Sequence, residues 1–329
     1  MFRLVRSAAA GFVLALVAGP LCRGLDPERK PWHYGMTQWQ DSEGLPRNTV
    51  HAVAQTLDGY IWLGTEGGLA RFNGREFVVF SRTTHPAMPN NGVVTLAAGP
   101  DGELWIGTRS GLVRYHNGRL QRVETGLWPA ESAIRQIQCD AAGQIWVAAG
   151  RGVARRKDGR WAYVYSEDSG LKPSAVRSLS VRGGEVWVGS TTGVDLFHGQ
   201  RRIPLPGGIP PDTVRAVLRD STGRVWIGTE NRGLYVIEAG RTRRIGPREG
   251  FAPISVRVMA EDRDGNVWIG TVGGGLCRYS QGRFDWLTTR QGLGSDHIRA
   301  LFEDREGNLW IGTEAGGVTR LRNGRVSTM

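Results

Sequence analysis

From residue 34 onward the chain consists of short runs in which apolar and polar residues alternate, separated by turns rich in Gly, Asn and Asp. Alternation with a period of two predicts β-strands, and short Gly-containing turns predict hairpins between them. The last stretch of this kind predicts strands at 298–303, 309–313 and 317–321, with turns at 304–308 and at Asn323-Gly324. A fourth strand is expected after that hairpin, at 325–329.

The same unit recurs seven times, each time with a Trp on its second strand. Successive Trp residues are 39 to 43 positions apart: Trp62, Trp105, Trp146, Trp187, Trp226, Trp268 and Trp310. A period near 42 with four short strands predicts an all-β fold, a seven-bladed β-propeller of four-stranded antiparallel blades. We expect the Trp side chains in the core, because each strand is covered by neighbouring blades. A small residue two positions after each Trp leaves room for that packing.

Residues 34–40 resemble a fourth strand without the three strands that precede it in a repeat. A propeller has to cover its edge strands, because a bare edge pairs with other chains. We therefore expect residues 34–40 to pair with 317–321 and to close the seventh blade. The segment 325–329 would then compete with it or remain free.

Residues 1–24 differ in composition from the rest of the chain. Arg3 and Arg6 precede an apolar run from Ala8 to Gly19, which is short for a membrane span and typical of a secretory signal peptide. We expect cleavage after Gly24, a periplasmic mature protein, and a single propeller domain at 25–329. An uncleaved anchor and a lipoprotein attached through Cys22 are the alternatives.

The chain is basic, with a formal net charge of +11 from 42 Lys and Arg residues against 31 Asp and Glu residues. Removal of Arg3, Arg6 and Arg23 with the leader reduces this to about +8, which favours anionic partners. A nucleic-acid partner is not expected, because the sequence contains no Lys/Arg-rich run and no recognition-helix pattern.

Several copies of the repeat carry the same short motif, as in Val225–Glu230, Val267–Thr271 and Leu309–Glu314. Together with the entry segment Trp39–Pro46, they resemble the two-component regulator propeller repeat over residues 33–325. The resemblance implies a periplasmic sensor domain of a bacterial signalling protein, and some members of the family bind oligosaccharides. Such domains usually precede a membrane helix and a histidine kinase or diguanylate cyclase. Neither is predicted after the seventh repeat, so a free-standing receptor and a truncated reading frame are both open.

The first strand of five blades carries Arg at one equivalent position. Because first strands line the channel of a propeller, these side chains predict a basic collar suited to carboxylate or sulfate groups. The alternative is that each Arg pairs with a carboxylate or carbonyl of a neighbouring blade. The five residues are Arg135, Arg177, Arg215, Arg257 and Arg299, with His51 and Val94 at the same position of the first two blades.

The loops between second and third strands share a face with the connections between blades, and variable loops on a rigid scaffold commonly bind ligands. A His–Glu group there is a candidate for acid–base chemistry or metal binding, although ordinary surface polar residues are the simpler explanation. No catalytic motif, cofactor site or metal site is expected elsewhere. The remaining ligand-binding candidates on this face are His297, Glu66, Arg109, Glu230, Arg232 and Glu314.

Three functions are compatible with these patterns. The first is a non-enzymatic sensor that acts with a membrane kinase or cyclase module and binds a small molecule or oligosaccharide, for which the basic charge favours an anion. The second is an exported propeller lyase or hydrolase that uses His51, His297, Glu66 and Glu314. This function requires the four side chains to converge. The third is a scaffold for protein partners.

Overall fold

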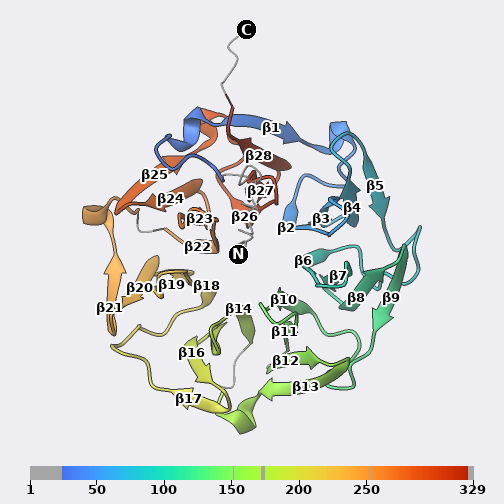
Figure 1. Ribbon diagram of the computed structural model, residues 1–329, viewed down its shortest axis with the longest axis horizontal. Helices are drawn as coiled ribbons and strands as arrows, with labels where there is room; N and C mark the ends of the chain where they lie inside the picture. Colours follow the sequence, from blue (N-terminus) through green and yellow to red (C-terminus); the bar gives the residue numbers. More distant parts are fainter. Residues whose placement is uncertain (1–23, 151, 172–174, 253, 325–329) are drawn as a thin grey trace, which may run out of the picture.

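The computed structural model describes residues 24–150, 152–171, 175–252 and 254–324. These residues form seven four-stranded antiparallel sheets arranged as blades around a central channel (Figure 1). The predicted seven-bladed propeller is thereby confirmed. The proposed leader, except for Gly24, and the segment 325–329 lie outside the described residues.

Each of the first six blades is built from four consecutive strands, with the first strand innermost. Blade 1 contains β2 (Val50–Gln55), β3 (Ile61–Thr65), β4 (Leu69–Phe72) and β5 (Phe77–Phe80). Blade 2 contains β6 (Val93–Ala98), β7 (Leu104–Thr108), β8 (Gly111–His116) and β9 (Arg119–Val123). Blade 3 contains β10 (Ile134–Cys139), β11 (Ile145–Ala149), β12 (Gly152–Lys157) and β13 (Arg160–Tyr165).

The second half of the ring repeats this order. Blade 4 contains β14 (Val176–Arg182), β15 (Glu185–Ser190), β16 (Gly193–His198) and β17 (Arg201–Ile203). Blade 5 contains β18 (Val214–Arg219), β19 (Val225–Thr229), β20 (Leu234–Glu238) and β21 (Arg241–Ile245). Blade 6 contains β22 (Val256–Glu261), β23 (Val267–Thr271), β24 (Leu276–Ser280) and β25 (Arg283–Leu287). Blade 7 contains β26 (Ile298–Glu303), β27 (Leu309–Thr313) and β28 (Val318–Arg322).

The outer strand of blade 7 comes from the other end of the sequence. Strand β1 (Gly35–Trp39) pairs antiparallel with β28, from Gly35 opposite Arg322 to Trp39 opposite Val318. The indole of Trp39 stacks on Trp310, with ring centroids 5.4 Å apart. The expected closure of the ring by the N-terminal strand is confirmed, and it covers the edge that β28 would otherwise expose.

The seven repeated Trp side chains are buried in the blades, with at most 4% of their surface exposed. Each indole N–H donates to a side chain in or beside the turn that precedes it; Trp310, for example, donates to Asp304 at 2.7 Å. In six blades an Arg guanidinium lies over the Trp ring, as Arg320 does over Trp310 at 5.7 Å. The expectation that these Trp residues form the core therefore holds.

Gly312 shows why the position two residues after the Trp is small. A Cβ atom built on Gly312 would lie 2.7 Å from the carbonyl oxygen of Val50, the first residue of β2 in the next blade. Real Cβ atoms do not approach so closely, so a larger residue there would push two blades apart. Blade 3 has Ala148 at this position, and it is fully buried.

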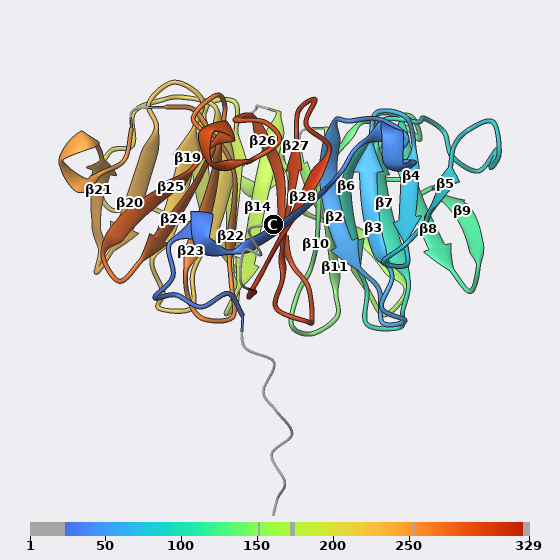
Figure 2. The same ribbon diagram turned by 90° about the horizontal axis from the view of Figure 1, so that it is seen from above.

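The disc has two different faces (Figure 2). On one face, here called the loop face, lie the connections between blades and the loops between second and third strands. On the other, the turn face, lie the short hairpins and the segment that begins at Gly24. That segment is held there by Asn323, whose side chain accepts from the N–H of Asp26 at 2.9 Å. In the described part of the chain, no helix is long and apolar enough to cross a membrane.

Candidate functional site

The innermost strand of every blade carries a β-bulge near its start, at the loop face. In β2, Val50 is opposite Thr65 and Ala52 is opposite Gly64, so His51 between them has no partner on β3. A bulge releases one residue from the ladder and re-aims its side chain. The bulged residues of the seven blades are His51, Val94, Arg135, Arg177, Arg215, Arg257 and Arg299.

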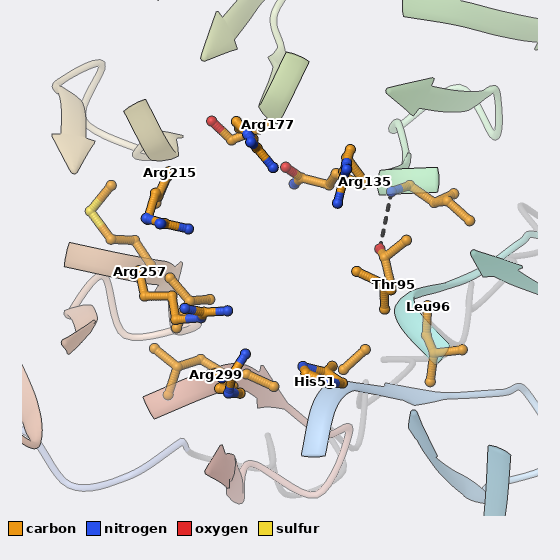
Figure 3. A pocket seen from close by; sticks show the side chains of 18 of the residues that line it. His51, Thr95, Leu96, Arg135, Arg177, Arg215, Arg257 and Arg299 are labelled. Carbon is orange, nitrogen blue, oxygen red and sulfur yellow. Dashed lines mark hydrogen bonds between the residues drawn. The ribbon is translucent and has the colours of Figure 1, made fainter. Parts of the chain in front are cut away.

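These bulged residues all line one cavity of about 350 Å³ in the mouth of the central channel. Figure 3 shows the five Arg side chains and His51 around this space, each from a different strand. The predicted collar is therefore present as a geometric feature. Its volume lies at the lower end of the range of small-molecule sites.

Three of the bulged side chains pair with a carboxylate of their own blade, and the partner is always 15 residues further on. His51 Nε2 lies 2.6 Å from Glu66 Oε1, and Arg299 Nη2 lies 2.7 Å from Glu314 Oε1. Arg215 donates in the same way to Glu230. The partner stands directly after the second strand, where the loop to the third strand begins.

The other three Arg residues of the collar lack such a partner, because the position 15 residues on carries no acid. It is Gly150 for Arg135, Thr192 for Arg177 and Val272 for Arg257. Among the described residues, no hydrogen bond or ion pair holds these three guanidinium groups; Nε of Arg177 is in addition buried without a partner. The alternative of complete pairing with neighbouring blades does not describe this collar.

Burial, with repulsion between like charges, lowers the pKa of two of the unpaired groups. Burial, followed by repulsion from Arg299 and Arg215, lowers the pKa of Arg257 from 12.5 to about 10. Burial and the charges of Arg177 and Arg109 also lower the pKa of Arg135. Arg257 still carries its proton at neutral pH, so the free protein holds an unfavourable concentration of positive charge that an anion would relieve.

Blade 1 contributes a different arrangement, in which one carboxylate serves two donors. Glu66 accepts from His51 and also from Arg109, which reaches over from blade 2. Burial lowers the pKa of His51 more than the hydrogen bond to Glu66 raises it. Burial alone would raise the pKa of Glu66, but His51 and Arg109 outweigh it and lower it. At neutral pH, His51 is therefore uncharged and its Nε2–H donates to an ionised Glu66.

The other candidates lie outside the cavity. His297 is exposed, and its Nδ1 is 4.0 Å from Glu314, which pairs more closely with Arg299. Arg232 is exposed on the loop face and does not line the cavity. His51, His297, Glu66 and Glu314 thus form two separate pairs. Within the described ranges, no group of three or more His, Cys, Asp or Glu side chains could hold a metal ion.

The opposite end of the same seven strands carries both signs of charge. Arg182, the last residue of β14, lies 2.6 Å from Glu261, the last residue of β22. Arg219, at the end of β18, lies 2.8 Å from Glu185 of blade 4. These pairs connect different blades, whereas the acid–base pairs of the bulged residues stay within one blade.

Sequence reasoning identified the Arg positions but missed the bulge and the pairing rule. The bulge has no marker in the residue types, since His, Val and Arg all occupy it. The pairing did leave a signal: the spacing of 15 residues between Arg215 and Glu230 recurs between Arg299 and Glu314 and between His51 and Glu66. Comparison of the seven repeats at that spacing separates the paired from the unpaired Arg residues.

Four of the repeats match the family model described as two component regulator propeller, at residues 87–110, 208–231, 250–273 and 292–315. This confirms the resemblance expected from the sequence. Each matched segment includes a bulged residue and the position 15 residues after it. No curated protein sequence matches the chain.

Solved structures share the fold at low sequence identity. The extracellular domain of the putative hybrid two component system BT3049 from B. thetaiotaomicron has a TM-score of 0.76 at 21% identity, over 89% of this chain and 42% of that one. The extracellular domain of BT4673 from the same organism has a TM-score of 0.73 at 23% identity, over 89% and 40%. This chain thus spans about two fifths of each.

A propeller enzyme also shares the fold. A catalytically inactive virginiamycin B lyase from Staphylococcus aureus, solved with quinupristin, has a TM-score of 0.70 at 13% identity, over 88% of this chain and 99% of that one. At these identities the likeness shows the common architecture alone.

Proposed function

We propose that this propeller is an extracytoplasmic sensor that binds an anionic small molecule or oligosaccharide at the mouth of its channel, without chemical conversion of the ligand. One observation carries the proposal: five of the seven bulges direct Arg side chains into one cavity, and three of these Arg residues have no carboxylate partner among the described residues. The two-component regulator propeller repeats and the fold shared with extracellular domains of two-component systems support the sensing role.

The charge balance of the mouth favours an anion. Six guanidinium groups, those of the collar and of Arg109, face three carboxylates, with His51 neutral. The surplus is three positive charges in a partly enclosed space. A carboxylate or sulfate accepts two parallel N–H donors from one guanidinium, so each unpaired Arg offers a bidentate site.

The signalling part of the proposal concerns a partner. A bound ligand touches several blades at once, because each collar residue belongs to a different blade. Binding would therefore alter the relative position of blades on the loop face, where a kinase or cyclase module could read it. The partner is a separate chain or a further part of the same protein.

The test is calorimetric titration of the protein with uronic-acid, sulfated and neutral oligosaccharides of matched length. We expect the acidic ligands to bind and the neutral ones to bind at least tenfold more weakly. Salt should weaken the acidic interaction, since part of the attraction acts over roughly 8–10 Å and is screened. Equal binding of neutral and acidic ligands would contradict the proposal.

The four side chains His51, His297, Glu66 and Glu314 do not converge, so the lyase or hydrolase site that uses all four is not formed. The pair of His51 and Glu66 alone favours a second candidate of the same class. A buried neutral His whose Nε2–H is fixed by a carboxylate leaves Nδ1 as a base beside cationic groups that stabilise a developing anion. The test is incubation with uronic-acid oligosaccharides and detection of unsaturated or shortened products by mass spectrometry. Turnover that disappears in His51→Gln would establish this function; unaltered ligand recovered from the wild type would exclude it for these substrates.

A further inference from the structure

A second cavity, of about 600 Å³, lies between blades 3 and 4 and opens on the turn face. It is separate from the collar, since no residue lines both. Its walls come from the turn 140–144 and strands β11, β12 and β13 on one side, and from the hairpins of blade 4 on the other. Blades 3 and 4 are the green blade and the adjacent yellow-green blade of Figure 1.

Two features of the sequence account for this space. Blade 4 joins its first two strands by the two residues Gly183 and Gly184, with φ of 60° and 80°, where blade 3 uses the five residues 140–144. A two-residue hairpin of this kind requires positive φ, which Gly tolerates, and it fills less volume. Both glycines line the cavity and contribute no side chain.

The second feature is Gln144, two residues before Trp146. In blade 5 the same position is Arg224, whose guanidinium lies 5.4 Å from the ring of Trp226 and 5.2 Å from that of Tyr279 in blade 6. In blade 1 it is Tyr60, which packs against the core. Gln144 is smaller than either of these residues.

The amide of Gln144 also differs from its shorter counterparts. Asn308 of blade 7 donates from Nδ2 to both oxygens of Asp304. In blade 3, Asp140 accepts from the backbone N–H of Gln144 and from the Trp146 indole. Oε1 of Gln144 is buried and accepts no hydrogen bond from any described residue. A buried acceptor without a donor is costly, and a ligand that supplies a donor removes the cost.

The rest of the lining combines apolar and aromatic side chains with the polar residues Asp140, His198 and Gln200 and with two Arg residues, Arg155 and Arg182. Val164, Val181 and Val186 face the space together with Trp146 and Tyr165. The hydroxyl of Tyr165 is already engaged, since it donates to the carbonyl of Gly199 at 2.7 Å.

Of the two Arg residues that line the cavity, Arg182 is paired with Glu261, which leaves Arg155 as the cation that faces a ligand. Its guanidinium lies 5.2 Å from the Trp146 ring and pairs with no carboxylate in the described part of the chain. An electron-rich aromatic ring is the neutral group best suited to an apolar space beside a guanidinium.

We infer that this cavity is a binding site for a neutral, electron-rich aromatic molecule that carries one O–H or N–H donor, of the phenol or indole kind. The ring occupies the apolar space beside Arg155, and the donor reaches Oε1 of Gln144. Neither the charge nor the position of the collar enters this assignment, so the site and the proposed sensing of anions stand or fall separately.

The probe is 2-naphthol, compared with 2-methoxynaphthalene, which has the same rings and no donor. We expect saturable binding of 2-naphthol by calorimetry and ligand-observed NMR, and about tenfold weaker binding of the methyl ether because it leaves Gln144 without a donor. This comparison uses the unaltered protein and does not depend on how any variant folds. Absence of 2-naphthol binding, or equal binding of the two probes, would overturn the assignment.

Other blades of the same protein show which residues to introduce at position 144. Gln144→Arg and Gln144→Tyr place in blade 3 the residues that blades 5 and 1 use at this position, and they should reduce 2-naphthol affinity at least tenfold. Arg224→Gln, the reverse change on the other side of the ring, and Arg257→Met in the collar should leave that affinity unchanged. Wild-type affinity in both Gln144 variants would overturn the assignment.

Discussion

The two ends of the central channel are built from the same seven strands, yet they differ in whether their Arg side chains have carboxylate partners. At the turn face, Arg182 and Arg219 pair with carboxylates of other blades, at 2.6 and 2.8 Å. At the loop face, five Arg side chains converge, and Arg135, Arg177 and Arg257 find no acid among the described residues. The charges named at the turn face connect blades, whereas three of the five Arg charges at the loop face have no partner among the described residues.

Under the proposed function, the turn-face end has a structural role and the loop-face end binds the ligand. A pair that bridges blades stabilises the closed ring, and Glu261 illustrates it by accepting from Arg182 and from the backbone N–H of Ser221 in blade 5. A group of unpaired like charges destabilises the free protein, and proteins commonly keep such groups where a ligand compensates them. We therefore call the two turn-face pairs, Arg182–Glu261 and Arg219–Glu185, the clasp, and the Arg collar at the loop face the receptor end.

The change with the largest expected effect opens the ring and thereby disturbs both ends of the channel. Deletion of residues 25–42 removes β1 and exposes the edge of β28. We expect a loss of several kcal/mol in the free energy of unfolding and concentration-dependent self-association through the bare edge. Chemical denaturation and analytical ultracentrifugation measure the two effects. A monomer as stable as the intact protein would mean that β1 does not close the blade in solution.

The next change affects the clasp alone. Glu261→Gln removes a carboxylate that is 11% exposed and accepts charge-assisted hydrogen bonds, so we expect a loss of about 2 kcal/mol of stability. Anion affinity should stay within about twofold of the wild type. Glu314→Gln is the control at the other end, where a 45% exposed carboxylate should change stability by less than about 1 kcal/mol. Similar losses for both variants would erase the distinction between the two ends.

Acidification should lower the stability of the protein and raise its affinity for a sulfated ligand at the loop-face end. Burial lowers the pKa of His51 from 6.5. As the pH falls below 6.5, His51 therefore becomes protonated in the unfolded chain before it does in the folded protein, and this lowers the free energy of unfolding. Arg299 lowers the pKa of Glu314, and His51 and Arg109 lower that of Glu66, both from 4.5. Stability supplied by these groups is present at neutral pH and declines as the pH falls below 6.5 and then below 4.5.

Over the same range, the mouth loses negative charge and gains positive charge. Sulfate esters stay ionised, so we expect affinity for a sulfated oligosaccharide to rise while stability falls. Titrations and denaturation curves between about pH 7 and about pH 4 test this, with His51→Gln as the variant in which the upper part of the dependence disappears. A parallel decline of affinity and stability would contradict the assigned charges.

The smallest effect concerns Arg215, the collar residue that is paired with Glu230 in the free protein. Glu230 neutralises Arg215 in the free protein, so Glu230→Gln should release one more guanidinium to an anion. Because both side chains are about one third exposed, we expect only a threefold or so gain in anion affinity, measured by calorimetry. Weaker binding in this variant would show that Glu230 contacts the ligand as an acceptor.

Much of the architecture follows from the sequence because a repeat constrains it seven times. The Trp spacing fixes the number of blades, and the unaccompanied strand at 34–40 identifies the closure that β1 provides. The Arg positions follow as well, since an equivalent position on first strands must face the same environment. These predictions depend on the periodicity of the sequence, and they can be made without knowledge of where the side chains point.

The remaining features depend on contacts within and between blades that periodicity does not specify. No residue type marks the bulge that turns Arg257 into the channel. The unfilled gap beside Gln144 arises because Gln144 is small and because a short hairpin of the next blade, Gly183-Gly184, stands opposite it. The bulge requires the register of two strands in one blade, and the gap requires the relative placement of two blades.

The measurement that tests the receptor most directly is a paired determination of stability and anion affinity for Arg257→Met. Met keeps an apolar stem in place while it removes the charge whose pKa is lowered to about 10 by burial and by Arg299 and Arg215. The account predicts that the free protein becomes more stable, by roughly 1 kcal/mol, while affinity for an acidic oligosaccharide falls about tenfold. A variant that is less stable than the wild type and binds the acidic ligand equally well would contradict it.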